Sequence, residues 1–171
     1  MRTIKTKVYK FNELTEDAKQ KAIEKNMEIN LMDRWWECEY EDAEQIGLKI
    51  KSFDLDRNRH ANGEFLLSAN EVAQNILNNH GETCETYKTT VRFMEEWQPI
   101  FNDYMNENSE NYESSELEEN LLELENEYLE NLLEDYSIIL QKQYEYLYSD
   151  EAIEETILAN EYEFTKDGKM I

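Results

Sequence analysis

Glycine, proline and cysteine are scarce in this chain, and each scarcity narrows what the protein can be. Its 171 residues include four Gly and one Pro, which favours long regular elements over elaborate loops. Two cysteines, Cys38 and Cys84, are too few for a disulfide framework, so we expect a reducing cytoplasm. No apolar run approaches the roughly 20 residues that cross a bilayer. Charged residues also interrupt the N-terminus where a signal peptide needs an apolar stretch.

Catalytic motifs are also missing. The chain has two His, and it contains no G-x-S-x-G, no Gly-rich phosphate loop and no H-E-x-x-H. Its 40 Asp and Glu would supply pairs of carboxylates by chance, so neighbouring acids do not by themselves indicate acid–base catalysis. We therefore expect no enzyme and no cofactor. An enzyme hidden around Asp54, Asp56 and His60 stays open as an alternative.

Metal sites have only weak support in the sequence. Asp54, Asp56 and Asn58 match the opening of a calcium loop, but Arg59 stands where that loop needs Gly, and Phe65 replaces its bidentate Glu. A polar turn in a β-hairpin explains these residues better. Four further residues could ligate zinc but lack the spacing of a zinc motif: Cys38, His60, His80 and Cys84. We expect no metal site.

Negative charge is what the chain has in excess. Its formal net charge is −23, and the stretch from Phe93 to Thr165 holds 22 Asp and Glu against one basic residue, Lys142. The chain is also 40% hydrophobic and 12% aromatic, which is typical of a protein that folds. Acidic character opposes direct binding to nucleic acid or to an anionic membrane, because both attract Lys and Arg. Concentrated like charge is costly in self-repulsion and therefore suggests a basic partner.

The N-terminal part of the chain predicts an α+β core over residues 1–101. Alternating apolar and basic residues in Thr3–Phe11 predict a strand, and Leu48–Leu55 with the following GEFLLS segment predicts a β-hairpin. Helices are expected at 15–29, at 33–46 before Gly47, after the capping box of Ser68 and Glu71, and from 83–86 up to Pro99. We expect a small antiparallel sheet of three to five strands, drawn from both chain ends and covered by helices.

The C-terminal part predicts a long acidic helix. Residues 102–114 are polar and form the expected linker, and Ser115 with Glu118 forms a second capping box. From there, apolar residues spaced by three and four predict a long helix that could run to about Tyr148, and the sequence leaves open whether it is one piece. A shorter helix and a terminal β-hairpin around Asp167–Gly168 complete the 115–171 segment and return to the core.

The expected long helix carries its glutamates on one side. Intervals of three or four residues place them in a stripe, and their carboxylates follow one another every 5 Å or so. Such a helix can imitate the charge of a nucleic-acid backbone and bind a channel that attracts phosphates. A solvated helix face without a binding role is the alternative. The expected partner-binding residues are Tyr112, Glu113, Glu116, Glu119, Glu123, Glu127, Tyr128, Glu130, Glu134, Asp135, Glu151, Glu154 and Glu155.

Four segments form a recognisable set: KVYKFNELTEDAKQKAI at 7–23, FDLDRNRHANGEF at 53–65, NHGETCETYKT at 79–89 and ILANEYEFTKDGKMI at 157–171. Together they resemble a family of small acidic proteins of bacteriophage and prophage genomes, most of them without assigned function. The resemblance implies an accessory phage protein in a bacterial host cytoplasm. Small acidic phage proteins include inhibitors of CRISPR nucleases and of restriction enzymes that occupy the DNA-binding cleft. No functional residues transfer from the family.

Charge and resemblance together predict an inhibitor of a basic, nucleic-acid-binding host protein. A CRISPR nuclease is the first expectation and a restriction enzyme the second, and the protein would act as an acidic DNA mimic. A regulatory or antitoxin-like module that binds a protein through its N-terminal α+β face is the alternative. Leucines on more than one face of the long helix also leave a helix-mediated homodimer open.

Overall fold

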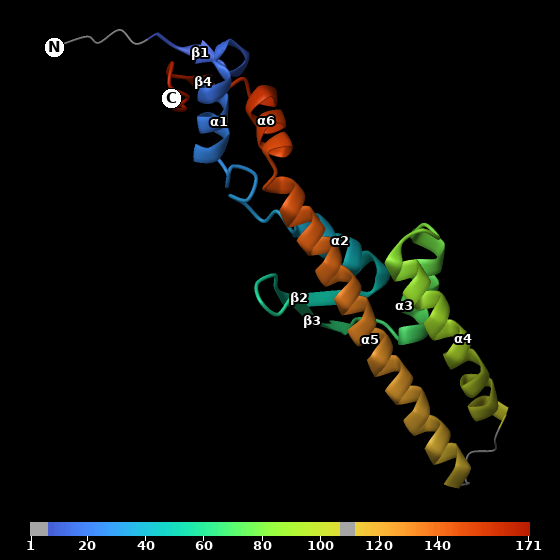
Figure 1. Cartoon of the computed structure of the whole chain (residues 1–171). Helices are drawn as coiled ribbons and strands as arrows, with labels where there is room; N and C mark the ends of the chain where they lie inside the picture. The colour runs from blue at the N-terminus through green and yellow to red at the C-terminus, as the bar shows by residue number, and fades with distance from the viewer. Residues whose placement is uncertain (1–6, 107–111) are drawn as a thin grey trace. The chain divides into compact units, whose positions relative to one another are not determined.

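A computed structural model describes residues 7–106 and 112–171 and shows an α+β protein with a long helix in its C-terminal half, which confirms the predicted fold class (Figure 1). The elements are β1 (Tyr9–Lys10), the 3-10 helix η1 (Phe11–Glu13), α1 (Glu16–Lys25), α2 (Glu37–Ile46), β2 (Leu48–Asp54), β3 (His60–Phe65), α3 (Ala69–Asn79), α4 (Glu85–Asn106), α5 (Tyr112–Leu147), α6 (Asp150–Ala159) and β4 (Glu163–Phe164).

The chain divides into two compact units. Unit 1 consists of Met1–Trp35 with Lys142–Ile171, and unit 2 consists of Trp36–Gln141. This division differs from the predicted order of a 1–101 core, a 102–114 linker and a 115–171 segment. Both ends of the chain belong to unit 1, and α5 contributes residues to both units.

The sequence predicts one sheet, but the described strands form two separate antiparallel pairs. In unit 1, β1 pairs with β4, and Tyr9 lies opposite Phe164. In unit 2, β2 pairs with β3, and Leu48 lies opposite Phe65. Strands from the two chain ends therefore do meet, as predicted, but the central hairpin forms its own sheet because it folds within the other unit.

Unit 1 packs around Phe11 and Phe164, whose rings meet edge to face with centroids 6.0 Å apart. Both side chains are buried, together with apolar residues of α1 and α6 such as Ile23 and Ile153. The predicted strand at Thr3–Phe11 is shorter than expected, because η1 begins at Phe11; its residues before Lys7 lie outside the described part. The helix predicted for 15–29 ends at Lys25.

Unit 2 forms its core between the β2–β3 hairpin and the helices that surround it. Leu48 and Ile50 of β2 are buried while Lys49 and Lys51 are exposed, which is the alternation of a strand with one face on a core. Gly47 ends α2 with φ +93°, which confirms the prediction that it terminates this helix. The helix begins at Glu37, later than the predicted residue 33.

The capping box before α3 is confirmed. The Glu71 main-chain N–H donates to the Ser68 hydroxyl at 3.3 Å, and the Ser68 main-chain N–H donates to the Glu71 carboxylate at 3.0 Å. These two hydrogen bonds satisfy donors that the first turn of a helix leaves unpaired. Val72 and Ile76 then point into the core and are fully buried.

The prediction that Pro99 ends its helix is wrong. α4 continues through Pro99 to Asn106, so residues 102–106 of the predicted linker are helical. A proline inside a helix costs about 3 kcal/mol because it removes one hydrogen bond and crowds the preceding turn. Packing offsets this cost: Trp97 is 4% exposed, and its ring stacks on that of Phe101 with centroids 4.3 Å apart.

The predicted long helix is present as α5, which is continuous, a point that the sequence leaves open, and which begins at Tyr112. Ser115 therefore lies inside the helix, and the predicted capping box of Ser115 with Glu118 is wrong. Residues 107–111 of the predicted linker lie outside the described part of the chain. Leu132 and Tyr136 are fully buried, so the apolar face of α5 packs on unit 2 as its spacing predicts.

The predicted turn at the C-terminus is present and depends on a glycine. The Thr165 main-chain N–H donates to the Lys169 carbonyl at 2.8 Å, and Phe164 forms a bridge with Met170. Gly168 has φ +81°, and a Cβ atom there would lie 2.1 Å from the main-chain oxygen of Ala18. Backbone conformation and close approach therefore both require glycine.

We expect Gly168→Ala to lower the free energy of unfolding by about 2–4 kcal/mol, because the new methyl group meets main-chain atoms of α1. Urea denaturation followed by circular dichroism measures the change. Gly81→Ala is the matched control, since the nearest atom to a Cβ there is Cys84 Sγ at 4.0 Å. The control should change stability by less than about 0.5 kcal/mol. Equal losses of stability in the two variants would contradict the conclusion that position 168 requires glycine.

Candidate protein-binding surface

Helices α4 and α5 lie antiparallel in unit 2 and are joined by aromatic contacts (Figure 1). The Phe93 and Tyr128 rings stack with centroids 4.0 Å apart and planes within 4° of each other. The Tyr128 hydroxyl lies 2.8 Å from Thr90 Oγ1, and the Trp97 indole N–H donates to Glu125 Oε1 at 3.1 Å. These contacts fix the register of the two helices and therefore the positions of the acidic residues on them.

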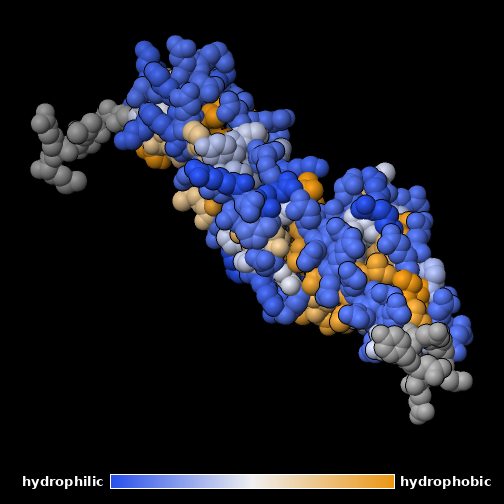
Figure 2. Space-filling model, turned by 60° about the horizontal axis from the view of Figure 1, so that its bottom comes forward, coloured by the Kyte–Doolittle hydropathy of each residue, from blue (hydrophilic) through white to orange (hydrophobic). Residues whose placement is uncertain are grey.

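The glutamates of α5 form an exposed stripe on the side away from the core. Residues three and four apart share one face of a helix, and all of these side chains are exposed. The α5 stripe consists of Glu116, Glu119, Glu123, Glu127, Glu130 and Glu134. Hydrophilic side chains cover most of the face drawn in Figure 2, and apolar atoms show in smaller patches. The predicted stripe is therefore present in the structure, and its role in binding stays a prediction.

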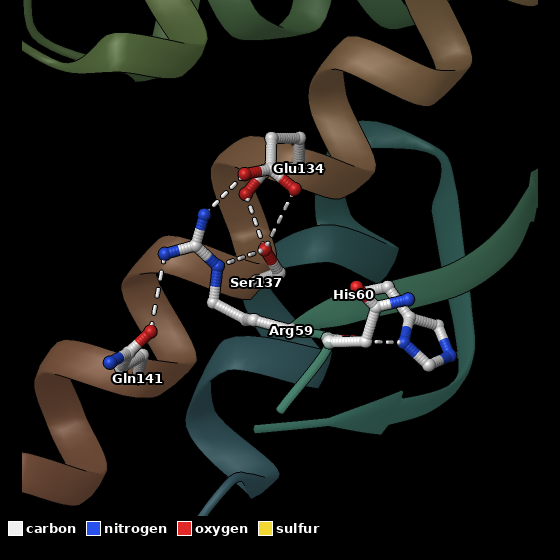
Figure 3. A network of polar contacts seen from close by, with 6 residues as sticks. Arg59, His60, Glu134, Ser137 and Gln141 are labelled. Atoms are coloured by element: carbon white, nitrogen blue, oxygen red, sulfur yellow. Dashed lines mark hydrogen bonds and ion pairs between the residues drawn. The ribbon is translucent and has the colours of Figure 1, made fainter. Parts of the chain in front are cut away.

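Arg59 engages the last member of the α5 stripe. From the turn before β3, its guanidinium forms an ion pair with Glu134, and its Nε donates to Ser137 Oγ at 3.0 Å (Figure 3). Its Nη1 donates to Gln141 Oε1 at 3.2 Å. The arginine thus ties the hairpin to α5 and neutralises Glu134. In the described ranges, the side chains of the other five stripe residues have no ion pair or hydrogen bond.

Two glutamates of α4 extend the acidic surface. Glu95 and Glu96 are exposed and border hollows between α4 and α5 together with Glu123 and Glu127. Glu127 lines three adjoining hollows and so stands at the centre of the surface. The sequence alone does not single out these two α4 residues, although they belong to the acidic stretch. The antiparallel pairing of α4 with α5, which brings these two residues beside the α5 stripe, cannot be deduced from spacing.

Two predicted partner-binding residues are buried, and the structure corrects them. Tyr128 is 2% exposed and packs in the core, so it has almost no surface to offer a partner. Asp135 is 9% exposed, and its Oδ2 has no hydrogen-bond partner among the described residues. Burial raises the pKa of the Asp135 carboxyl, although a hydrogen bond with Thr89 opposes part of this shift. Each of them directly follows a member of the α5 stripe in sequence, and this one-residue offset turns its side chain toward the core.

The other predicted partner-binding residues lie elsewhere or are not described. Tyr112 and Glu113 belong to the first turn of α5, and their side chains lie outside the described part. Glu151, Glu154 and Glu155 lie on α6 of unit 1, so they do not belong to the surface formed by α4 and α5. The structure therefore brings together the stripe residues of α5 and two residues of α4.

The weak metal candidates form part of the hairpin turn. The Asp56 main-chain N–H donates to Asp54 Oδ1 at 2.8 Å, and the Asn58 carbonyl lies 2.7 Å from His60 Nδ1. Both contacts are local turn contacts. Within residues 7–106 and 112–171, no group of three His, Cys, Asp or Glu is arranged to hold a metal ion. The described cysteines are both free and exposed.

One polar network has the components of a hydrolase triad. His80 Nδ1 lies 2.8 Å from Thr86 Oγ1, and His80 Nε2 lies 3.8 Å from Asp42 Oδ1. Asp42 Oδ2 accepts a hydrogen bond of 2.7 Å from the Tyr136 hydroxyl. Thr86 is only 2% exposed, so a substrate cannot reach the hydroxyl that would act as nucleophile. The network joins α2, α4, α5 and the residue that follows α3 within unit 2.

Nearly all the net charge of the protein belongs to unit 2. Residues 36–141 contain 26 Asp and Glu and six Lys and Arg, a formal charge of −20 out of −23. Exposed carboxylates without ion-pair partners attract cations and basic surfaces, but they lack the burial or the neighbours that tune a group for proton transfer. This surface is therefore suited to binding.

No protein-family model, curated protein or solved structure matches this chain. Over the described residues, the structure also contains no helix with the length and apolar character needed to cross a bilayer.

Asp135→Asn should stabilise the protein at neutral pH by about 1 kcal/mol, or roughly 2–4 °C in thermal midpoint, because it removes a buried charge. Burial raises the pKa of the Asp135 carboxyl in the folded state. The contribution of this carboxyl to the free energy of unfolding is therefore most favourable below about pH 4 and is lost as the pH rises. In thermal unfolding experiments, the rise in midpoint caused by Asp135→Asn should therefore be larger at neutral pH than at acidic pH.

Glu130→Gln is the matched control for Asp135→Asn, because it removes the same charge from an exposed position. Its effect on the midpoint should be smaller and should depend more strongly on salt. A gain for Asp135→Asn that does not change with pH would contradict the proposed cause.

Proposed function

We propose that this protein binds a basic, nucleic-acid-binding protein through the acidic surface of α4 and α5 and thereby occupies the partner's phosphate-binding surface. The observation that carries the proposal is the α5 stripe, in which five consecutive members, Glu116 to Glu130, are exposed and lack ion-pair partners among the described residues. Over this distance the helix rises about 21 Å. A surface that served solubility alone would more often mix both signs of charge.

The spacing of the carboxylates supports mimicry of a nucleic-acid strand. Along the stripe they follow one another every 5 Å or so, and phosphates along one strand of duplex DNA rise about 3.4 Å each, so the two rows of negative charge agree in scale but not in exact spacing. Glu95 and Glu96 on α4 add charge beside the stripe. Because α4 and α5 are fixed by aromatic packing, this charge is held in place before a partner arrives. Such preorganised charge favours rapid, salt-dependent association.

A host defence nuclease is the proposed partner class. Proteins that cut or bind DNA present a cleft rich in Lys and Arg, which an acidic surface of this kind complements. The resemblance to phage accessory proteins favours a CRISPR nuclease first and a restriction enzyme second. Inhibition would be steric and electrostatic, and it would need no cofactor.

Unit 1 supports a second candidate, a regulatory or antitoxin-like module without DNA mimicry. A groove of about 510 Å³ there is lined by the side chains of Met27, Met32, Met170, Tyr148 and Tyr162, among others. Met32 is 81% exposed, which is unusual for a large apolar side chain. Methionine-rich surfaces adapt to apolar side chains of a partner.

We expect the variant with Glu119, Glu123, Glu127 and Glu130 all changed to Gln to lose most of its partner binding. The measurement is capture from a bacterial lysate on immobilised protein, at about 50 mM and about 500 mM NaCl, with mass spectrometry of the bound proteins. The wild type should retain a basic nucleic-acid-binding protein at low salt. High salt, or added duplex DNA that competes for the same cleft, should release it.

A second quadruple variant controls for net charge. Asp17, Glu41, Glu44 and Glu82 are exposed and lie outside α4, α5 and the unit 1 groove, so changing all four to the corresponding amides removes the same charge from other places. This control should bind like the wild type. Unchanged capture by the stripe variant would refute DNA mimicry, and loss of capture on Met32→Glu instead would favour the second candidate.

A further inference from the structure

An apolar hollow interrupts the acidic surface between α4 and α5. It has a volume of about 480 Å³, and Pro99, Ile100 and Leu124 form its apolar lining. Ile100 and Leu124 are partly buried and pack against the core of unit 2. The hollow is large enough to receive an apolar side chain, which is a feature that imitation of a phosphate backbone does not require.

Carboxylates stand on both sides of this hollow. Glu95 and Glu96 come from α4, and Glu123 and Glu127 come from α5. All four are exposed, and within the described ranges their side chains have no ion pair. A ligand that enters the hollow with an apolar group therefore passes between two acidic walls.

Pro99 contributes an apolar ring to the lining of the hollow. Proline has no N–H, so the helix lacks the hydrogen bond that residue 99 would otherwise donate to the carbonyl of residue 95. The carboxylates beside the hollow suit a guanidinium, which presents five N–H donors in a planar fork.

We propose that this groove, bounded by Glu95, Glu96, Glu123 and Glu127, binds a basic amphipathic helix of the partner protein. One large apolar side chain of that helix enters the hollow over Ile100 and Leu124, and Arg or Lys side chains three or four residues away reach the acidic walls. The inference deepens the proposed function, because it states which element of a basic partner this surface recognises.

Charge complementarity selects this occupant over a second copy of the chain. Two copies meeting at this face would bring together two units of −20 each, with no basic residues on α5 before Lys142 to compensate. Nucleic acid and anionic membranes are repelled for the same reason. A basic helix supplies both the apolar group and the cations that the groove can hold.

The test is fluorescence anisotropy of the full-length protein with two labelled peptides of about 18 residues, a length that allows an isolated helix to form. One peptide places Arg three and four residues away from a central Leu, so that Leu and Arg lie on the same side of the helix, and the other has the same composition in scrambled order. We expect the amphipathic peptide to bind at least about tenfold more tightly at physiological salt. Equal affinities for the two peptides would overturn the proposal.

Single substitutions test the groove directly. Ile100→Ala should weaken binding of the amphipathic peptide about three- to tenfold through lost apolar contact. Pro99→Ala should weaken it by about threefold because it removes part of the apolar ring that lines the hollow. The same change should raise the thermal midpoint, because alanine suits a helix better than proline. Weaker binding by a more stable protein cannot result from unfolding, and unchanged binding by both variants would overturn the proposal.

Two double variants separate this inference from the proposed function. Glu95→Gln with Glu123→Gln alters the walls of the groove, and Glu119→Gln with Glu130→Gln removes the same charge from the outer part of the stripe. The first should weaken peptide binding more than the second. Equal losses would refute the groove but leave a general acidic surface intact. No loss in either would count against both proposals.

Discussion

The stacked rings of Phe93 and Tyr128 are the contact on which the acidic surface depends. They hold α4 and α5 in register, and the Tyr128 hydroxyl on α5 forms a hydrogen bond with the Thr90 hydroxyl on α4. Burial raises the pKa of the Tyr128 hydroxyl, so it stays protonated and can share this hydrogen bond. This packing opposes the repulsion between the exposed carboxylates of the two helices. The aromatic core of unit 2 thus converts a charge-rich sequence into charge with a fixed geometry.

Repulsion between glutamates opposes the formation of helix α5. Neighbouring glutamates three and four residues apart each destabilise a helix by a few tenths of a kcal/mol, and no lysine relieves them before Lys142. The buried side of the helix, including Leu132 and Tyr136, supplies the compensating stability. Arg59 neutralises one end of the α5 stripe and anchors it to the hairpin. The rest of the stripe keeps its charge, which is the condition that binding a basic partner requires.

Local signals in the sequence predict much of this fold, and the errors occur where distant contacts decide. The capping box at Ser68 and the terminating Gly47 are properties of a few adjacent residues, and both are confirmed. Pro99 by itself predicts the end of a helix. Burial of Trp97, which contacts Glu125 of α5, keeps α4 helical beyond the proline. Tyr128 and Asp135 fit an acidic and aromatic surface in sequence, yet the orientation of α5 against α4 places them inside. The α4 side of the groove could not be predicted, because it depends on that pairing.

The account depends on the acidic surface of unit 2 being both ordered and uncompensated. Thermal unfolding of the wild-type protein as a function of NaCl concentration tests this claim most directly. Uncompensated repulsion is screened by salt, so the midpoint should rise by about 3 °C or more between about 10 mM and about 500 mM NaCl. A midpoint that stays constant or falls would mean that favourable ion pairs balance the carboxylates, and it would contradict the account.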